Sequence, residues 1–402
     1  MMENLDLKHR FMRQPTAEWL AESQVMDSFV DVGGIEQFWR QWYLQGFVDA
    51  GVGKMKFVRG RPGSGKTHFL RHLGLMAKHD GYMVVHIDCG RTRIMAIDEL
   101  YRAIAIHLPW EEVIDHCALS VIQESLGYRD FELSVSEFFH WAGETHGRSS
   151  SILASDVRDE TDKWIRGLDM HSAWVLPIRT LILRKITGEA GNEEPVYRWL
   201  RGQKLSAAER RDIGVSTNVD RRNARAMLLS MAVLTHVASY RGLVVCVDNV
   251  DVMARTVRSD GVPYYTRGNR DQAYEMLREL IDESYHSAYL FLVVVGNTEL
   301  YDNQKTGFPS YPALAARLQS EITTVQLNRF ADLVDLDATL SQHFEDQSRI
   351  LEVWQTTGEN VKLDPAADTE GMGRSIQTEP ESVRRTVVKA LAGSTGGASY
   401  GL

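Results

Sequence analysis

The sequence predicts an α/β protein built on a parallel sheet, and two observations carry that prediction. Five short runs are nearly continuous in Val, Ile, Leu and Phe: Lys54–Gly60, Tyr82–Cys89, Leu243–Val250, Tyr289–Gly296 and Ile322–Leu327. Such runs are typical of parallel strands that are covered on both faces. Helical patterns, for example Lys66–Ala77 and Asp271–Tyr285, lie between the runs. Strands that alternate with helices indicate an α/β fold.

Composition favours a soluble globular protein. The chain has 402 residues, of which 44% are hydrophobic and 25% charged, and its length exceeds the roughly 100–200 residues of one domain. Its first residues, MMENLDLKHRFMRQ, carry charges where a signal peptide would be apolar, and no run reaches the roughly 18 apolar residues of a membrane helix. Cys89, Cys117 and Cys246 are too far apart for a disulfide framework or zinc spacing. We therefore expect a cytoplasmic protein without a membrane partner.

The spacing of the runs predicts four segments. Residues 1–91 hold an N-terminal segment and the first part of the core, and 241–329 hold the second part. Residues 92–240 separate the second run from the third, which is far more than one crossover needs. Helical periodicity there indicates an insertion with a small core of its own. Residues 330–402 are predicted to form a helical lid and a flexible tail.

One motif predicts the chemistry. Residues 60–67, GRPGSGKT, match G-x-x-x-x-G-K-[ST] between a predicted strand and a predicted helix, the context that a P-loop requires. Glycines there let backbone N–H groups cradle phosphates at the helix N-terminus. Lys66 would reach the β- and γ-phosphates, and the Thr67 hydroxyl would bind Mg²⁺. The cofactors predicted are ATP and Mg²⁺, and the binding residues are Gly60, Pro62, Gly63, Ser64, Gly65, Lys66, Thr67 and His68.

An acid at the end of a neighbouring strand would complete a magnesium–triphosphate site. Asp248 ends the third run and is predicted to hold the metal. Many ATPases of this kind have a Glu next, which polarises the attacking water, but here the next residue is Asn249. An amide orients water but takes no proton, so hydrolysis would be slow or would depend on Asp251. Alternatively, Asp251 only caps the following helix.

Three further positions are candidates for contact with the γ-phosphate. Asn297 follows the fourth run and would sense the phosphate or the attacking water, unless it is only a cap or turn residue. Arg317 would be an arginine finger that reaches a neighbouring subunit, or else a surface salt-bridge partner. Arg384 or its neighbour Arg385 would close onto the phosphates from the lid, and only one of the two would face the site.

The net charge of −9 argues against non-specific coating of nucleic acid. One basic stretch nevertheless qualifies as a surface for DNA or a partner, with a solvated helix face as the simpler interpretation. Its arginines are Arg210, Arg211, Arg221, Arg222 and Arg225.

Several segments resemble a known family. The predicted strands and their polar ends are similar to the AAA+/ASCE-type P-loop ATPases, near the origin-recognition type. More specifically, FVRGRPGSGKTHFLRHL, VYRWLRGQKLS, GLVVCVDNVDVM, QAYEMLRELIDES and VVVGNTELYDNQKTGFPSYPALAARL resemble the ATP-binding protein of BREX phage-defence systems. PSYPALAARL after a strand ending in Gly-Asn-Thr is the most distinctive part. The likeness covers residues 32–329.

This resemblance implies an ATPase of bacterial antiviral defence that acts with DNA-handling partners, as a homo-oligomer or in a complex with other defence proteins. By motif, Lys66 and Thr67 bind phosphate and metal, and Asp248 is the acid on the metal side. Asn249 departs from the family's usual Glu. Three functions are expected as alternatives: an ATP-driven switch or motor subunit, a nucleotide-stabilised scaffold with little turnover, and an origin-recognition-like DNA-binding ATPase that acts as a clamp-like DNA loader through the basic stretch.

Overall fold

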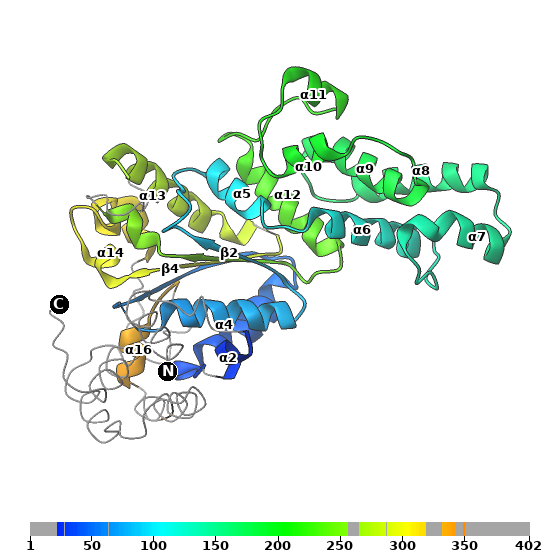
Figure 1. Cartoon of the computed structure of the whole chain (residues 1–402). Coiled ribbons are helices and arrows are strands. Elements are labelled where there is room, and N and C mark those ends of the chain that lie inside the picture. The colour runs from blue at the N-terminus through cyan, green and yellow to red at the C-terminus, as the bar shows by residue number, and fades with distance from the viewer. Residues whose placement is uncertain are drawn as a thin grey trace, which may run out of the picture.

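A five-stranded parallel sheet with strand order β2-β3-β4-β1-β5 forms the centre of the molecule (Figure 1). The computed structural model describes residues 22–27, 29–62, 64–255, 265–286, 288–318, 332–342 and 349. The strands are β1 (Lys54–Gly60), β2 (Met83–Asp88), β3 (Leu243–Asp248), β4 (Leu290–Asn297) and β5 (Leu333–Asp335). The predicted α/β class is confirmed, and the order of the strands is that of a P-loop sheet.

The apolar runs located four strands to within one or two residues at each end. The fifth predicted run, Ile322–Leu327, lies outside the described residues. The fifth strand that the structure describes is the three-residue β5, whose pairing with β1 is supported by an ion pair between Arg59 and Asp335 at 2.7 Å. Three residues give too little periodicity for a sequence pattern to reveal them.

Successive side chains of a strand point to opposite faces of the sheet, so the core has two layers. Phe57 packs with the helices of one face and Val58 with those of the other. α4 (Lys66–His79), α3 (Ile35–Trp39) and the π-helical turn η3 (Arg40–Val48) cover the second face. α5 (Ile97–Ala105), α12 (Ala224–Val237) and α13 (Arg267–Asp282) cover the first (Figure 1).

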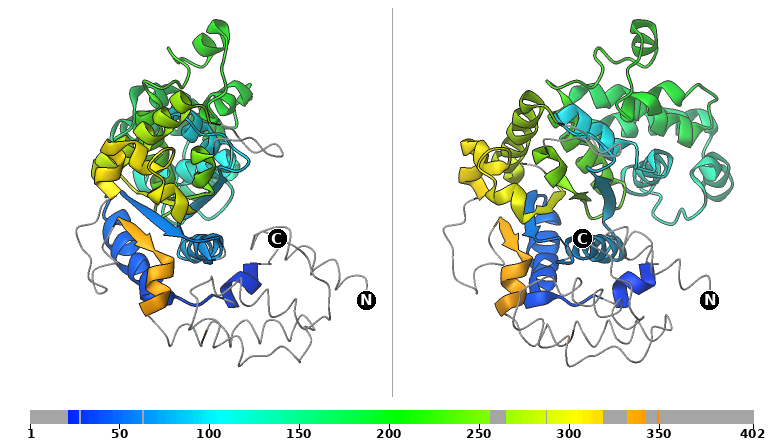
Figure 2. Two further views of the ribbon diagram at one scale, coloured as in Figure 1. Left: turned by 90° about the vertical axis from the view of Figure 1, so that its left-hand side faces the viewer. Right: turned by 60° about the vertical axis from the view of Figure 1, so that its left-hand side comes forward.

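The segment between β2 and β3 is helical and projects beyond the sheet as an arm (Figure 1). Both views of Figure 2 place its green helices on the opposite side of the sheet from the blue α4 and the orange α16. Besides α5 and α12 it contains α6 (Trp110–Ser120), η4 (Val121–Ser125), η5 (Val135–Glu137), α7 (Phe138–His146), α8 (Ser150–Arg166), α9 (Ser172–Thr187), α10 (Glu194–Leu200) and α11 (Ala207–Asp212).

The core of this arm is not separate, which corrects the expectation from sequence. One continuous cluster of buried side chains runs from Phe57 of β1 to the tryptophans of the arm. Trp110 and Trp174 have ring centroids 5.8 Å apart, and Trp174 and Trp199 are 6.2 Å apart. α5 and α12 belong at once to the sheet and to the arm, so apolar side chains fill the space between them without a break.

Short elements complete the described part of the chain. They are α2 (Glu22–Asp27), η2 (Val32–Gly34), η6 (Val250–Ala254), η7 (Ser284–His286), α14 (Thr298–Asp302), η8 (Phe308–Ser310), α15 (Pro312–Leu318) and α16 (Leu336–Gln342). Within the described ranges, no helix is long and apolar enough to cross a membrane.

Candidate nucleotide site

The P-loop joins the end of β1 to the start of α4. Gly65 precedes α4 with φ of +89°, a backbone conformation that side chains with a Cβ rarely adopt. A Cβ on Gly60 would lie 2.3 Å from Ser64 Oγ, so a larger residue there would require the Ser64 side chain to move. Gly63, also predicted to bind phosphate, lies outside the described residues. Of the loop glycines that the structure describes, Gly65 therefore has the backbone conformation that favours glycine, and Gly60 packs closely against Ser64.

Lys66 is folded into this loop. Its Nζ donates to the carbonyl oxygens of Gly60 at 2.9 Å and Arg61 at 2.8 Å, and the residue is buried. Burial lowers the pKa of Lys66, and the nearby carboxylates of Asp251 and Asp248 act in the opposite direction. A buried ammonium held by carbonyls, with further donor capacity, is suited to binding an anion.

Two buried hydroxyls point to a ligand at this edge of the sheet. Ser64 Oγ in the loop and Thr298 Oγ1, just after β4, have no hydrogen-bond partner among the described residues. A buried polar atom without a partner is costly, and such atoms require an explanation. Phosphate oxygens at the P-loop would accept a hydrogen bond from Ser64.

Thr67 and Asp248, the two residues for which the sequence predicts a metal-binding role, lie in contact with each other. Thr67 Oγ1 donates to Asp248 Oδ2 at 2.7 Å, and the backbone N–H of Asn249 donates to Asp248 Oδ1 at 2.7 Å. Burial raises the pKa of Asp248. One carboxylate and one hydroxyl fit Mg²⁺, which takes few protein ligands and completes its shell with phosphates and water. The described residues contain no group of three or more metal-binding His, Cys, Asp or Glu side chains.

Asn249, the residue after Asp248, is hydrogen-bonded to a carboxylate on the neighbouring strand. Asn249 adopts a left-handed backbone conformation with φ of +58°, and its Nδ2 donates to Asp88 Oδ1 at 2.8 Å. Asp251 in η6 forms an ion pair at 3.1 Å with Arg255, the residue that follows this helix. The N-cap position of η6 belongs to Asn249, so Asp251 does not cap this helix.

Asn297 lies at the same edge of the sheet as the P-loop. It ends β4 and pairs in register with Gly60, and it occupies the N-cap position of α14 without a side-chain capping bond. His68, in the first turn of α4, stacks on Phe29 with ring centroids 5.7 Å apart. Arg384 and Arg385 lie outside the described residues, as does most of the predicted lid.

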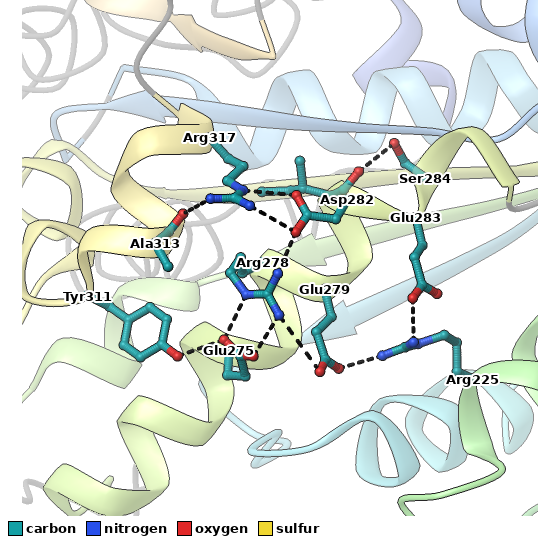
Figure 3. A network of polar contacts seen from close by, with 11 residues as sticks. Arg225, Glu275, Arg278, Glu279, Asp282, Glu283, Ser284, Tyr311, Ala313 and Arg317 are labelled. Atoms are coloured by element: carbon teal, nitrogen blue, oxygen red, sulfur yellow. Dashed lines mark hydrogen bonds and ion pairs between the residues drawn. The ribbon is translucent and has the colours of Figure 1, made fainter.

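Arg317 is part of a network of charged side chains on α12, α13 and α15 (Figure 3). Its guanidinium contacts Asp282 of α13 at 2.9 and 3.2 Å. A salt bridge was the alternative expected for this residue beside the role of an arginine finger. The other participants are Arg225, Glu275, Arg278, Glu279, Glu283 and Tyr311. The network joins α15 to α13 and α13 to α12.

The arginines of the basic stretch are not equivalent. Arg225 is bound by Glu279 and Glu283, each at 2.5 Å, and so belongs to the network of Figure 3. Arg210 and Arg211 donate to carbonyl oxygens of their own helix region. Arg221 lies 3.8 Å from Asp98 and Arg222 3.0 Å from Asp220, with side chains 56% and 89% exposed. Arg211, Arg221 and Arg222 are therefore the exposed arginines of this stretch, and Arg221 and Arg222 are adjacent in the chain.

Two carboxylates at the site were not singled out from the sequence. Asp88 ends β2 beside Asp248, and Asp337 Oδ2 accepts a hydrogen bond from the Arg61 N–H at 2.6 Å. A signal for Asp88 existed, because it lies at the carboxyl end of a predicted strand. Asp337 follows the short β5, which no pattern revealed.

The comparison with protein families agrees with this geometry. The model of the BREX system ATP-binding protein BrxC/D matches residues 44–363, which is most of the chain. The chain belongs to the BREX ATP-binding protein family. The family is a component of a phage-defence system, and the resemblance expected from the sequence is confirmed. No curated protein and no solved structure matches this BREX protein.

Proposed function

We propose that this BREX protein is an ATP-hydrolysing switch subunit of a defence complex. The observation that carries the proposal is the convergence of Lys66, Thr67 and Asp248 at the carboxyl edge of the sheet. Lys66 and the N–H groups of the loop would hold the phosphates, while Thr67 and Asp248 would hold Mg²⁺. Bound Mg²⁺ would neutralise part of the negative charge on the phosphates. The protein's contribution is positioning and electrostatic stabilisation.

The network of Figure 3 supports a switch rather than an isolated ATPase. It connects α15, which follows the β4 end of the site, through α13 to α12 of the arm. A nucleotide-dependent shift near Asn297 would thereby bias the position of the arm, where partners would bind. The partners in this proposal are further copies of the chain or other defence proteins.

Lys66→Ala tests the proposal. Removal of the ammonium is expected to weaken ATP binding by at least about tenfold and to abolish turnover, because a charge-assisted contact to phosphate is lost. Calorimetric titration with ATP measures the affinity, and steady-state phosphate release measures the turnover. Lys163→Ala, in an exposed pair with Glu160 on the arm, is the matched control. Equal ATP binding and turnover by wild type and Lys66→Ala would contradict the proposal.

A scaffold that binds ATP without useful turnover is the second candidate. Asn249 favours it, because the residue directly after Asp248 is an amide and not an acid. The same titration separates the two candidates. Tight ATP binding that needs Lys66, with no phosphate release in the presence or absence of DNA, would support the scaffold. Turnover that needs Lys66 would eliminate it.

DNA is a possible partner through Arg221 and Arg222, whose side chains remain exposed. Charge reversal of both residues to Glu is expected to weaken duplex binding and to reduce its salt dependence by a slope of about 2. Fluorescence anisotropy with a labelled duplex over a range of salt concentrations measures both effects. Arg225→Gln is a poor probe because that side chain is bound by two glutamates. Unchanged binding by the reversed variant would exclude this surface.

A further inference from the structure

The carboxylate that position 249 lacks is present on the adjacent strand. Asp88 and Asp248 are register partners at the ends of β2 and β3. Asn249, which follows Asp248, reaches across to Asp88 with a hydrogen bond of 2.8 Å from Nδ2 to Oδ1. An amide and a carboxylate thus form a pair at this edge, with the acid on β2 rather than on β3.

The orientation of the Asp88 side chain is fixed by donors on one oxygen. Oδ1 accepts from Asn249 Nδ2 and from the N–H of Gly90, both at 2.8 Å. A Cβ on Gly90 would lie 2.9 Å from Oδ1, so glycine allows the backbone to approach the carboxylate. Oδ2 faces the exposed guanidinium of Arg91 at 3.4 Å. With 26% of the side chain exposed, a water molecule can reach it.

Asp251, the acid that the sequence suggested for this task, is engaged differently. Only 12% of its side chain is exposed, and it forms an ion pair with Arg255. Asp88 is more exposed, at 26% of its side chain, and two donors hold one of its oxygens in place, which makes it the more accessible and better oriented acceptor for water.

We propose that Asp88 is the catalytic carboxylate that orients and deprotonates the attacking water, and that Asn249 is its positioning residue. The assignment rests on the proposed hydrolysis of ATP. In this step the water oxygen bonds to the γ-phosphorus, and the bond from that phosphorus to the bridging oxygen breaks. The electron pair of the broken bond stays on ADP. The water proton passes to Asp88 and then to solvent, so that ADP and inorganic phosphate are formed.

Three variants test this assignment: Asp88→Asn, Asp251→Asn and the exchange Asp88→Asn/Asn249→Asp. Asp88→Asn keeps an acceptor for Asn249 and Gly90, so we expect its melting temperature to stay close to that of wild type. Its turnover is expected to fall at least about 100-fold, the contribution of a general base. The exchange returns an acid to the pair and is expected to recover at least about tenfold of that loss. Asp130→Asn, an exposed carboxylate near the tip of the arm, is the matched control.

A binding measurement accompanies the kinetics. Affinity for ATP should be nearly equal in wild type and Asp88→Asn, whereas affinity for ADP with aluminium fluoride, which mimics the state of water attack, should fall about tenfold in the variant. A loss in Asp251→Asn equal to or larger than that in Asp88→Asn would overturn the assignment. So would unchanged turnover or unchanged aluminium fluoride binding in Asp88→Asn.

The outcome also separates this assignment from the proposed function. A wild-type chain that binds ATP through Lys66 but releases no phosphate, and whose aluminium fluoride complex does not depend on Asp88, overturns the assignment and leaves ATP binding standing. A wild-type chain that binds no ATP overturns both.

Discussion

Replacement of Asp248 by Asn is expected to lower ATP turnover about 1000-fold while the protein stays folded, since loss of one group that holds charge in the transition state costs this much. Asp248 is the carboxylate nearest to the Thr67 hydroxyl, and a neutral amide is a poor ligand for Mg²⁺ beside it. The Asn side chain can still accept from the Asn249 N–H, and its own N–H can donate to Thr67 once the hydroxyl rotates. The local hydrogen bonds are therefore kept.

Phosphate release at saturating magnesium and ATP measures this effect, and thermal unfolding checks the fold. Because burial raises the pKa of Asp248, loss of this charge should not lower the melting temperature. Thr67→Ser, which keeps the hydroxyl, is the matched control and should retain most of the turnover. Turnover near the wild-type level in Asp248→Asn would remove this residue from the metal side of the site.

Replacement of Asp332 by Ala is expected to destabilise the fold by about 3 kcal/mol, a typical cost for removing one partner of a buried ion pair. Two buried ammonium groups contact this carboxylate, Lys54 at 2.9 Å and Lys56 at 3.2 Å. The Lys56 side chain is fully buried, and its Nζ lies 4.2 Å from the centroid of the Tyr43 ring. Asp332 is 35% exposed, which keeps the expected loss at the lower end of the range.

Denaturant unfolding at pH 6, below the pKa of about 7 that burial gives Lys56, measures this loss. Lys56→Met in the Asp332→Ala background is the matched variant, because it removes one of the two buried charges and should recover part of the stability. Stability of Asp332→Ala equal to that of wild type would show that these lysines do not depend on Asp332.

The same lysine gives the unfolding free energy a dependence on pH. Burial lowers the pKa of Lys56 to about 7, from 10.5 in an exposed lysine. Between these values the unfolded chain binds a proton that the folded chain does not, so stability should rise as pH increases from about 7 to 10. Lys56→Met should show a flatter profile over this window. An equally steep profile in Lys56→Met would assign the rise to other groups.

Sequence motifs predicted those features of the site that depend only on residues close together in the chain. The P-loop motif located Lys66 and Thr67, and the apolar run before Asp248 located the carboxylate that lies next to Thr67. The first prediction needs only a strand followed by the P-loop, and the second needs only a strand that ends in an acid. A single segment of the sequence is therefore enough for each prediction.

Contacts between distant segments were beyond such patterns. The bond from Asn249 to Asp88 joins residues 161 positions apart, and it depends on β2 and β3 being neighbours in the sheet. Arg225 was interpreted as part of a basic surface because its two glutamates lie 54 and 58 residues away. The order of the strands decides the first contact, and the packing of α12 on α13 decides the second. Residue spacing within one segment predicts neither of them.

The continuous core of the arm has a mechanical consequence. A module with a separate core can pivot on a hinge, whereas the buried side chains of the arm pack continuously with those of the sheet, from Phe57 to Trp199. The arm is therefore expected to move together with α5 and α12, which pack on β2 and β3, and not to swing independently of them. A small displacement of these two helices would then be carried along the arm to α7 (Figure 1).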